Sequence, residues 1–233
     1  MKPVLVLQHM DGDGPGYLAT WLQRRGVPFE VFNTAAGQDF PSSMDAHGAL
    51  AVLGGEMSAN DDLPSLRRAE ALIRESMAGD RPVIGHCLGG QLMAKALGAR
   101  VVDAAAPEIG WQTMRVLAHR EATAWFGGAT ELTVFQWHHE AFELPQGAVP
   151  LAGSEACAHQ AFAVGRHLGM QFHVEVDAHK LALWSASRDR AYLRLQKTCP
   201  TVQGGEAMRA QAAEALAAQQ ALADRLYARW LGA

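Results

Sequence analysis

The sequence predicts an α/β protein, with a mixed central sheet and helices on both of its faces. Up to Gly98, apolar runs that suit strands alternate with runs that suit helices, and this alternation is typical of a parallel sheet with covered faces. After Gly98, short strand-like runs are separated by glycine, proline and aspartate, which favours antiparallel pairing. An alanine-rich helical run then closes the sequence.

The first part of the chain contains four predicted strands and three predicted helices. The strands cover residues 3–10, 27–33, 48–55 and 81–87, and the helices cover residues 16–26, 63–80 and 89–98. In the helix over 63–80, the apolar residues Leu66, Ala69, Ile73 and Met77 recur at helical spacing before a glycine. This helix therefore has one apolar face that can pack on the sheet.

The second part contains shorter strand-like runs and two helices. The runs cover residues 99–105, 110–117, 131–139, 149–154, 160–165 and 167–176, and helices are predicted over 180–196 and 204–233. Leu222, Leu226 and Trp230 form an apolar stripe on the closing helix, which we expect to dock on its own domain rather than on a partner. We expect a single domain over residues 1–233, with a helical extension from about residue 181.

Composition excludes several classes of protein. Apolar residues make up 49% of the 233 residues and charged residues 19%, which suits a packed core rather than disorder. The formal net charge is −4 and no basic block is present, so nucleic-acid binding is not expected. No apolar run has the length of a membrane span or a secretory signal. The three widely spaced cysteines match neither a disulfide framework nor a zinc pattern, which favours the cytoplasm.

One of the cysteines, Cys87, lies in the segment Gly85-His86-Cys87-Leu88-Gly89, between a predicted strand and a predicted helix. Glycines two residues before and after a nucleophile are the pattern of a nucleophile elbow, where strand and helix crowd together at a sharp turn. The nucleophile then lies at the carboxyl end of a strand, and the helix N-terminus favours its thiolate form. For this pattern alone, a buried structural cysteine is the alternative.

A second segment, MQFHVEVD at residues 170–177, contains an acid–base group and a carboxylate. His173 and Glu175 are two residues apart and would point to the same face of a strand. Glu175 can then orient the imidazole of His173, as carboxylates do in other triads. The alternative is a half-exposed strand that carries two polar residues, which the cysteine elbow makes less favourable.

Together these motifs resemble the class I (triad-type) glutamine amidotransferases, and especially stand-alone proteins similar to the amidotransferase domain of GMP synthase. The similar segments are GHCLGGQLMAKALGA at 85–99, QFHVEV at 171–176, VLGGEMS at 52–58, EIGW at 108–111 and the segment 136–162. The resemblance implies the flavodoxin-like α/β fold of that family. It also implies that Cys87 is the nucleophile, His173 the acid and base, and Glu175 the partner that orients His173.

The resemblance further implies the residues around the substrate. The expected oxyanion-hole N–H groups belong to Gly55 and Leu88. The expected substrate-binding residues are Gly54, Gln91, Trp137 and His138. Two departures from the family pattern are present. Val174 replaces the proline of Q-F-H-P-E, which loosens the backbone but leaves the catalytic residues. His139-Glu140 replace the usual Gly-Asp near the expected pocket mouth, and this bulkier pair leaves the substrate open. No ATP-pyrophosphatase domain follows in the sequence, so this chain alone is not expected to make GMP.

Three other features carry weaker signals. The histidines near the expected site lack a familiar zinc spacing, so neither a metal nor another cofactor is expected. The segment DGDGPG at 11–16 matches no dinucleotide fingerprint, and we expect a loop at the rim of the site. His86 is expected to be packed or hydrogen-bonded, with its side chain directed away from Cys87.

Three functions are compatible with these patterns. The first is a glutaminase that hydrolyses the γ-carboxamide of glutamine to glutamate and ammonia through a cysteinyl thioester, and passes the ammonia to a separate synthetase. The second is a free-standing hydrolase of γ-glutamyl peptides or amines. The third is a catalytically silent binding or regulatory module. The expected partner is a small-molecule substrate, and the sequence leaves open both a homodimer and a separate synthetase subunit.

Overall fold

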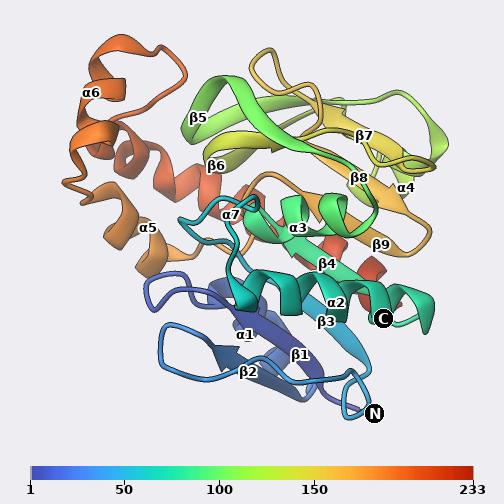
Figure 1. The fold of residues 1–233 in the computed structure, drawn as a ribbon. Helices are drawn as coiled ribbons and strands as arrows, with labels where there is room; N and C mark the ends of the chain where they lie inside the picture. Colours follow the sequence, from blue (N-terminus) through green and yellow to red (C-terminus); the bar gives the residue numbers. More distant parts are fainter. Residues whose placement is uncertain (1, 233) are drawn as a thin grey trace.

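A computed structural model describes residues 2–232, and one nine-stranded sheet runs through it (Figure 1). The strands are β1 (Val4–Gln8), β2 (Phe29–Asn33), β3 (Ala49–Val52), β4 (Val83–His86), β5 (Val101–Val116), β6 (Glu131–Phe142), β7 (Val149–Gly153), β8 (Ala161–Val164) and β9 (His167–Met170). Their order in space is β2-β1-β3-β4-β9-β8-β7-β5-β6. Neighbours from β2 to β9 are parallel and those from β9 to β6 are antiparallel, which confirms the mixed sheet.

Helices connect and cover these strands. They are α1 (Gly16–Arg24), α2 (Pro64–Ala78), α3 (Leu88–Ala96), α4 (Arg120–Phe126), α5 (Ala178–Ser185), α6 (Arg190–Thr198) and α7 (Gly205–Leu231). The short helix α4 was not expected from the sequence; His119 caps its start and Gly127 ends it in the left-handed region. Over residues 2–232, no helix combines the length and the apolar character that a membrane crossing requires.

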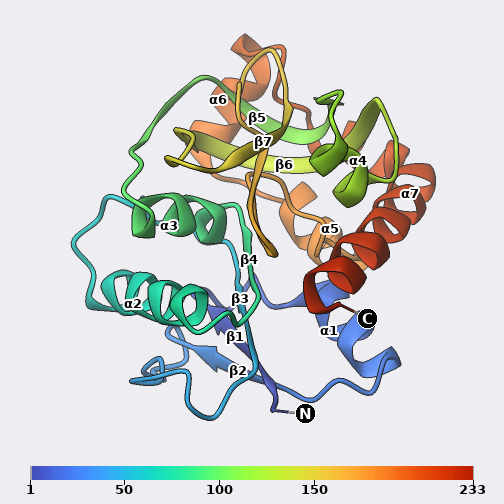
Figure 2. The same ribbon diagram turned by 90° about the vertical axis from the view of Figure 1, so that its right-hand side faces the viewer.

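The parallel strands β1, β3, β4 and β9 are buried on both faces, as the sequence predicted, whereas the edge strand β2 is partly exposed. Figure 2 shows α2 and α3 on one side of β1, β3 and β4, and α1 and α7 on the other. Leu5 and Leu7 face the helices α2 and α3, whereas Val4 and Val6 face α1 and α7. Strands covered on both faces need continuous apolar sequence, which explains the run VLVL in β1.

The closing helix α7 docks on its own chain, which confirms the expectation for its apolar stripe. Leu222, Leu226 and Trp230 are all buried. The neighbouring Tyr227 packs edge-on against Trp21 of α1, with ring centroids 5.7 Å apart. This packing places the last turns of α7 beside α1, on the same face of the sheet (Figure 2).

Two strand predictions were wrong in their limits. The runs at 99–105 and 110–117 form one strand, β5, with a register shift between Asp103 and Glu108. The run predicted over 167–176 stops at Met170, and the chain then leaves the sheet because the N–H of His173 donates to the carbonyl of Phe135 at 2.9 Å. His173 and Glu175 therefore lie on a turn segment and not on a strand.

The helix predicted over 180–196 was also wrong, because it is two helices. The helix α5 ends at Ser185 and α6 begins at Arg190. The carboxylate of Asp189 accepts a hydrogen bond from the N–H of Tyr192 at 2.8 Å and so caps the new helix. A side chain that caps a new start competes with continuing the previous helix.

Candidate active site

The predicted elbow is present where β4 meets α3. β4 ends at His86, α3 begins at Leu88, and Cys87 between them has φ +49° and ψ −109°. A positive φ is unfavourable for any residue other than glycine and is often found at functional sites. A Cβ on Gly85 would lie 2.5 Å from the carbonyl of Gly89, and one on Gly89 would lie 2.1 Å from the carbonyl of Val52. The two glycines therefore permit the close contact of strand and helix.

Cys87 opens onto a cavity of about 600 Å³. The lining residues are Met10, Gly12, Asp13, Gly55, Glu56, Met57, Cys87, Gln91, Trp137, His138, His139, Glu140, His173, Leu183, Trp184, Ser187, Asp189 and Tyr192. Among the residues expected at the site, Gly54, Leu88 and Glu175 are not part of this lining. The predicted loop at 11–16 contributes Gly12 and Asp13 to this lining.

His173 and Glu175 form a close polar contact near Cys87. Nδ1 of His173 lies 2.7 Å from Oε1 of Glu175, and both side chains are buried. The other ring nitrogen, Nε2, has no hydrogen-bond partner among the described residues. Burial by itself lowers the pKa of His173, but the charges of Glu175 and Cys87 outweigh burial and raise that pKa to about 10.

Glu175 lies behind His173 and away from the cavity. Burial by itself raises the pKa of this carboxyl, but Lys180, His173 and His86 outweigh burial and hold the pKa well below its usual range. Lys180 was not identified from the sequence as a site residue. In the structure, its Nζ lies 3.2 Å from Oε1 of Glu175. His86 is buried and hydrogen-bonded as expected, with Nε2 3.3 Å from the hydroxyl of Tyr227.

The two residues expected to form the oxyanion hole are neighbours, because a Cβ on Gly55 would lie 2.9 Å from Cδ2 of Leu88. Leu88 is the first residue of α3, and Gly55 lies in the loop after β3 and lines the cavity. Gly54 has a packing role, because a Cβ there would lie 2.5 Å from Oδ2 of Asp13 and 2.9 Å from Cε1 of His173. A larger residue at Gly54 would displace both side chains.

Gln91 is tied into the wall of the cavity. Its Nε2 donates to the carbonyl of Glu140 at 3.0 Å and to Oε1 of Gln171 at 3.3 Å. Gln171 in turn donates from Nε2 to Sγ of Cys87 at 3.6 Å. Gln171 was not identified from the sequence as a site residue, although it lies in the same short segment as His173.

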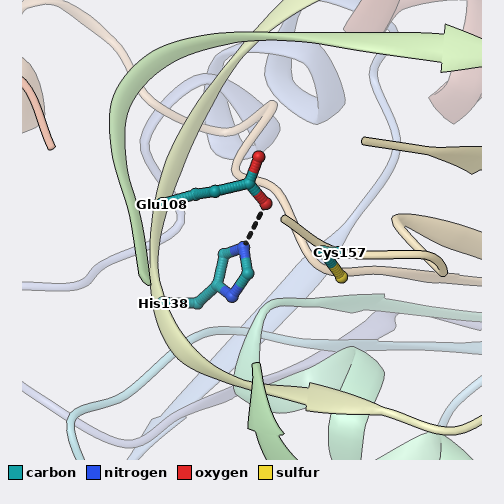
Figure 3. A group of neighbouring side chains, drawn as sticks. All are labelled: Glu108, His138 and Cys157. Carbon is teal, nitrogen blue, oxygen red and sulfur yellow. Dashed lines mark hydrogen bonds and ion pairs between the residues drawn. The ribbon is translucent and has the colours of Figure 1, made fainter. Parts of the chain in front are cut away.

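His138 is one of the lining residues, and its ring contacts Glu108 (Figure 3). Nε2 of His138 lies 3.1 Å from Oε2 of Glu108, which also accepts from Gln160 at 2.6 Å. Oε1 of Glu108 accepts from Ser154 at 2.8 Å. Cys157 lies nearby, and burial raises the pKa of its thiol to about 12. This cluster fixes the ring of His138 through a carboxylate whose two oxygens already have protein donors.

Aromatic side chains from three elements form the remaining wall. Trp137 on β6 packs against Trp184 of α5 and Tyr192 of α6, with ring centroids 5.8 Å and 5.1 Å apart. Trp184 also lies edge-on to His173, at 4.9 Å between centroids. The break between α5 and α6 therefore places two helices beside the cavity, which a single helix over 180–196 would not do.

The raised pKa of His173 predicts how stability depends on pH. The pKa of a histidine in the unfolded chain is near 6.5, whereas that of His173 in the folded chain is about 10. The higher folded pKa stabilises the folded form, and this contribution is complete below about pH 6.5. This contribution is lost as pH rises from about 6.5 through about 10. We expect the free energy of unfolding of the wild type, relative to His173→Gln, to fall across this window in urea titrations. A constant difference between the two proteins would contradict the assigned charge state.

Comparison with known proteins identifies the family. The family described as "Glutamine amidotransferase class-I" matches residues 17–181. The chain is 33% identical over 177 residues to the glutamine amidotransferase-like protein YfeJ of Salmonella typhimurium, covering 72% of this chain and 73% of YfeJ. This protein belongs to the class I glutamine amidotransferase family.

Two further similarities agree with this assignment. A glutamine-hydrolyzing GMP synthase subunit of Thermoplasma acidophilum is 32% identical over 140 residues, which are 58% of this chain and 67% of that protein. The crystal structure of a glutamine amidotransferase from Methylobacillus flagellatus superposes with a TM-score of 0.91 at 37% identity, covering 100% of this chain and 95% of that one. The flavodoxin-like α/β fold of the family is thereby confirmed.

Proposed function

We propose that this chain hydrolyses a γ-glutamyl amide, with glutamine as the first candidate substrate, through a thioester on Cys87. The observation that carries the proposal is the arrangement of three side chains. Cys87 stands at a strained elbow and opens onto the same cavity as His173, whose Nδ1 lies 2.7 Å from Glu175. A nucleophile, a base and a group that orients the base are the parts that acyl transfer requires.

In the proposed reaction, the thiolate of Cys87 attacks the δ-carbonyl carbon of the substrate. The N–H groups of Leu88 and Gly55 hold the oxyanion that forms. The carbon–nitrogen bond then breaks as His173 gives its proton to the departing nitrogen, which leaves as ammonia when glutamine is the substrate. A γ-glutamyl thioester remains on Cys87.

Hydrolysis of the thioester uses the same histidine as a base. The charge of Cys87 contributes to the raised pKa of His173, and this charge disappears when the thioester forms. The neutral imidazole can then take a proton from water, whose oxygen attacks the thioester carbon. Glutamate leaves, the sulfur departs as thiolate, and the original charge pair of Cys87 and His173 is restored.

The oxyanion assignment predicts the effect of bulk at Gly55. A Cβ there would lie 2.6 Å from Sδ of Met57 and 2.9 Å from Cδ2 of Leu88, which are ends of flexible side chains. Gly55→Val should therefore fold but disturb the donor beside the reacting carbonyl, and we expect kcat to fall by about 10²–10³-fold. Steady-state kinetics and circular dichroism of Gly55→Ala and Gly55→Val would check this. Full activity in the valine variant would refute the assignment.

A separate synthetase is the proposed recipient of the ammonia. One relative is named as glutamine-hydrolyzing and as one subunit of a GMP synthase. By analogy, this chain would release ammonia toward a partner enzyme that uses it. Glutaminase activity that rises when that partner is added would support this part of the proposal.

A second candidate, hydrolysis of γ-glutamyl amines, is favoured by the charge of the cavity. Within the described residues the lining contains the carboxylates of Asp13, Glu56, Glu140 and Asp189, and neither lysine nor arginine. Because Asp13 is paired with Lys180, the other three are available to attract a positive charge. A leaving group that carries an ammonium would be stabilised there by Coulomb attraction.

A turnover assay with the isolated protein separates the candidates. L-glutamine would be compared with γ-glutamyl peptides and with γ-glutamyl diamines, and glutamate release would be followed by mass spectrometry. Rapid release from one conjugate, with glutamine nearly inert, would identify a free-standing hydrolase. Slow release from glutamine alone would favour a subunit that works with a synthetase. If no substrate released glutamate in a reaction that requires Cys87, a silent binding module would be favoured.

A further inference from the structure

We propose that Lys180 and Asp13 form a buried ion pair that positions Glu175, and through Glu175 the imidazole of His173. Lys180 does not line the cavity, so it is a positioning residue rather than a catalytic one. The inference rests on the proposed function for its kinetic readout. It adds to the expected cysteine, histidine and glutamate two residues that no sequence motif indicates.

The contacts of Lys180 are unusually complete for a lysine. Its Nζ donates to Oδ1 of Asp13, to Oε1 of Glu175 at 3.2 Å and to the carbonyl of Gly14 at 3.1 Å. The side chain is 4% exposed, and those of Asp13 and Glu175 are 5% and 0% exposed. Lysine is almost never buried to this extent without partners, because an unpaired ammonium is costly to remove from water.

The oxygen that Lys180 contacts is the one that orients His173. Oε1 of Glu175 accepts from Lys180 and also lies 2.7 Å from Nδ1 of His173. Oε2 has no hydrogen-bond partner among the described residues and lies 3.9 Å from Nε2 of His86. Without Lys180, the contact with His173 would be the only hydrogen bond to this carboxylate among the described residues. Lys180 therefore fixes the position and rotation of the carboxylate that keep one oxygen directed at the imidazole.

The loop at 11–16 is built for this contact. Gly16 has φ +47°, and a Cβ there would lie 2.3 Å from the carbonyl of Glu175 and 3.0 Å from Cδ of Lys180. The N–H of Tyr17 donates to the same carbonyl at 2.9 Å. Asp13, Gly14 and Gly16 of DGDGPG, a segment that matches no nucleotide fingerprint, are thus explained by their contacts with Glu175 and Lys180.

The titratable groups around Glu175 and its ion pair come from several elements. Lys180 comes from α5, Asp13 from the loop after β1, His86 from the end of β4 and Tyr227 from α7. With His173 protonated, positive and negative groups alternate from Asp13 through Lys180 and Glu175 to His173. The positive charge of Lys180 partly offsets the negative charge of Glu175. This lowers the proton affinity of His173, which must give a proton to the leaving group.

The first test replaces Lys180 with methionine, which keeps most of the side-chain length and removes the charge. We expect Lys180→Met to lower kcat by about 10–100-fold with KM within about twofold of wild type. The alkaline limb of the pH–rate profile should move to higher pH, because His173 loses a neighbouring positive charge. Lys2→Met, which removes an exposed lysine bonded to the carbonyl of Asp45, is the matched control. Wild-type kcat in Lys180→Met would overturn the proposal.

A second readout does not require turnover. Nitrogen-15 NMR of labelled histidine should show the His173 ring titrating at higher pH in Lys180→Met than in the wild type, and an unchanged titration would overturn the proposal. If the proposed function itself is wrong, the wild type will show no glutamate release that requires Cys87. Lys180→Met leaves the buried carboxylates of Asp13 and Glu175 without their shared cation, which can prevent folding. The double variant Asp13→Asn with Lys180→Met removes one of these two charges and is the alternative if the single variant does not fold. It should keep the low kcat, and recovery of wild-type kcat would overturn the proposal.

Discussion

Replacing Cys87 with alanine is expected to lower the release of glutamate by about 10⁴-fold or more, because the only proposed nucleophile is lost. The fold should persist, since alanine fits the space of the thiol and accepts the same backbone conformation no worse than cysteine does. Cys87 is held at the elbow by its N–H, which donates to the carbonyl of Met170 at 2.9 Å, and alanine keeps this contact. Circular dichroism and thermal unfolding would show that the loss is chemical.

Cys199→Ala provides the matched control for this prediction. Cys199 is a partly exposed thiol at the end of α6 and does not line the cavity. We expect Cys199→Ala to keep wild-type turnover and to leave alkylation of Cys87 unchanged. If Cys87→Ala kept substantial turnover, or Cys199→Ala lost it, the assignment of the nucleophile would be incorrect.

His173→Gln is expected to lower kcat by about 10³–10⁴-fold, because His173 both delivers the proton to the leaving group and activates water. Glutamine has a similar length and can still donate toward Glu175, which retains Lys180 as a partner. The buried charges therefore keep a counterion, and most of the loss should come from the chemistry rather than from unfolding.

Combining the two substitutions tests whether the side chains act as one unit. The double variant Cys87→Ala with His173→Gln should be no slower than Cys87→Ala alone, since residues of one catalytic unit give strongly non-additive losses. Steady-state kinetics of the two single variants and the double variant would decide this. Losses that multiply across the double variant would indicate that Cys87 and His173 act independently.

The elbow could be predicted from sequence because its constraint is local. Glycines on both sides of Cys87 are required by contacts within the turn and with the adjacent strand β3, and such contacts leave a recognisable spacing. The pairing of His173 with Glu175 was also predicted, although for a wrong reason. The segment was expected to be a strand, whereas a turn brings the two side chains together. Apolar alternation does not reveal where an extended segment leaves the sheet.

The surroundings of Glu175 could not be predicted in this way. Lys180 and Asp13 are 167 residues apart in the chain, and neither lies in a motif that indicates the other. Their contact depends on how α5 packs against the loop after β1, which is a property of the tertiary fold. The same is true of Glu108 and His138, which lie 30 residues apart and meet across paired strands.

The break between α5 and α6 is an intermediate case. Apolar residues continue at nearly helical spacing through the segment, so periodicity favoured one helix. The capping carboxylate of Asp189 was the contrary signal in the sequence, and it alone marks the start of α6. This break places Trp184 and Tyr192 on the cavity wall, so a local capping contact shapes the space available to the substrate.

The most direct test of the account is mass spectrometry of the protein quenched in acid during turnover. The wild type would be mixed with L-glutamine and, separately, with a γ-glutamyl diamine, and peptides would be analysed without a reducing agent. A thioester mechanism at Cys87 predicts a γ-glutamyl group on the peptide that contains Cys87, and none in Cys87→Ala. Turnover without this adduct, or an adduct on another residue, would contradict a thioester mechanism at Cys87.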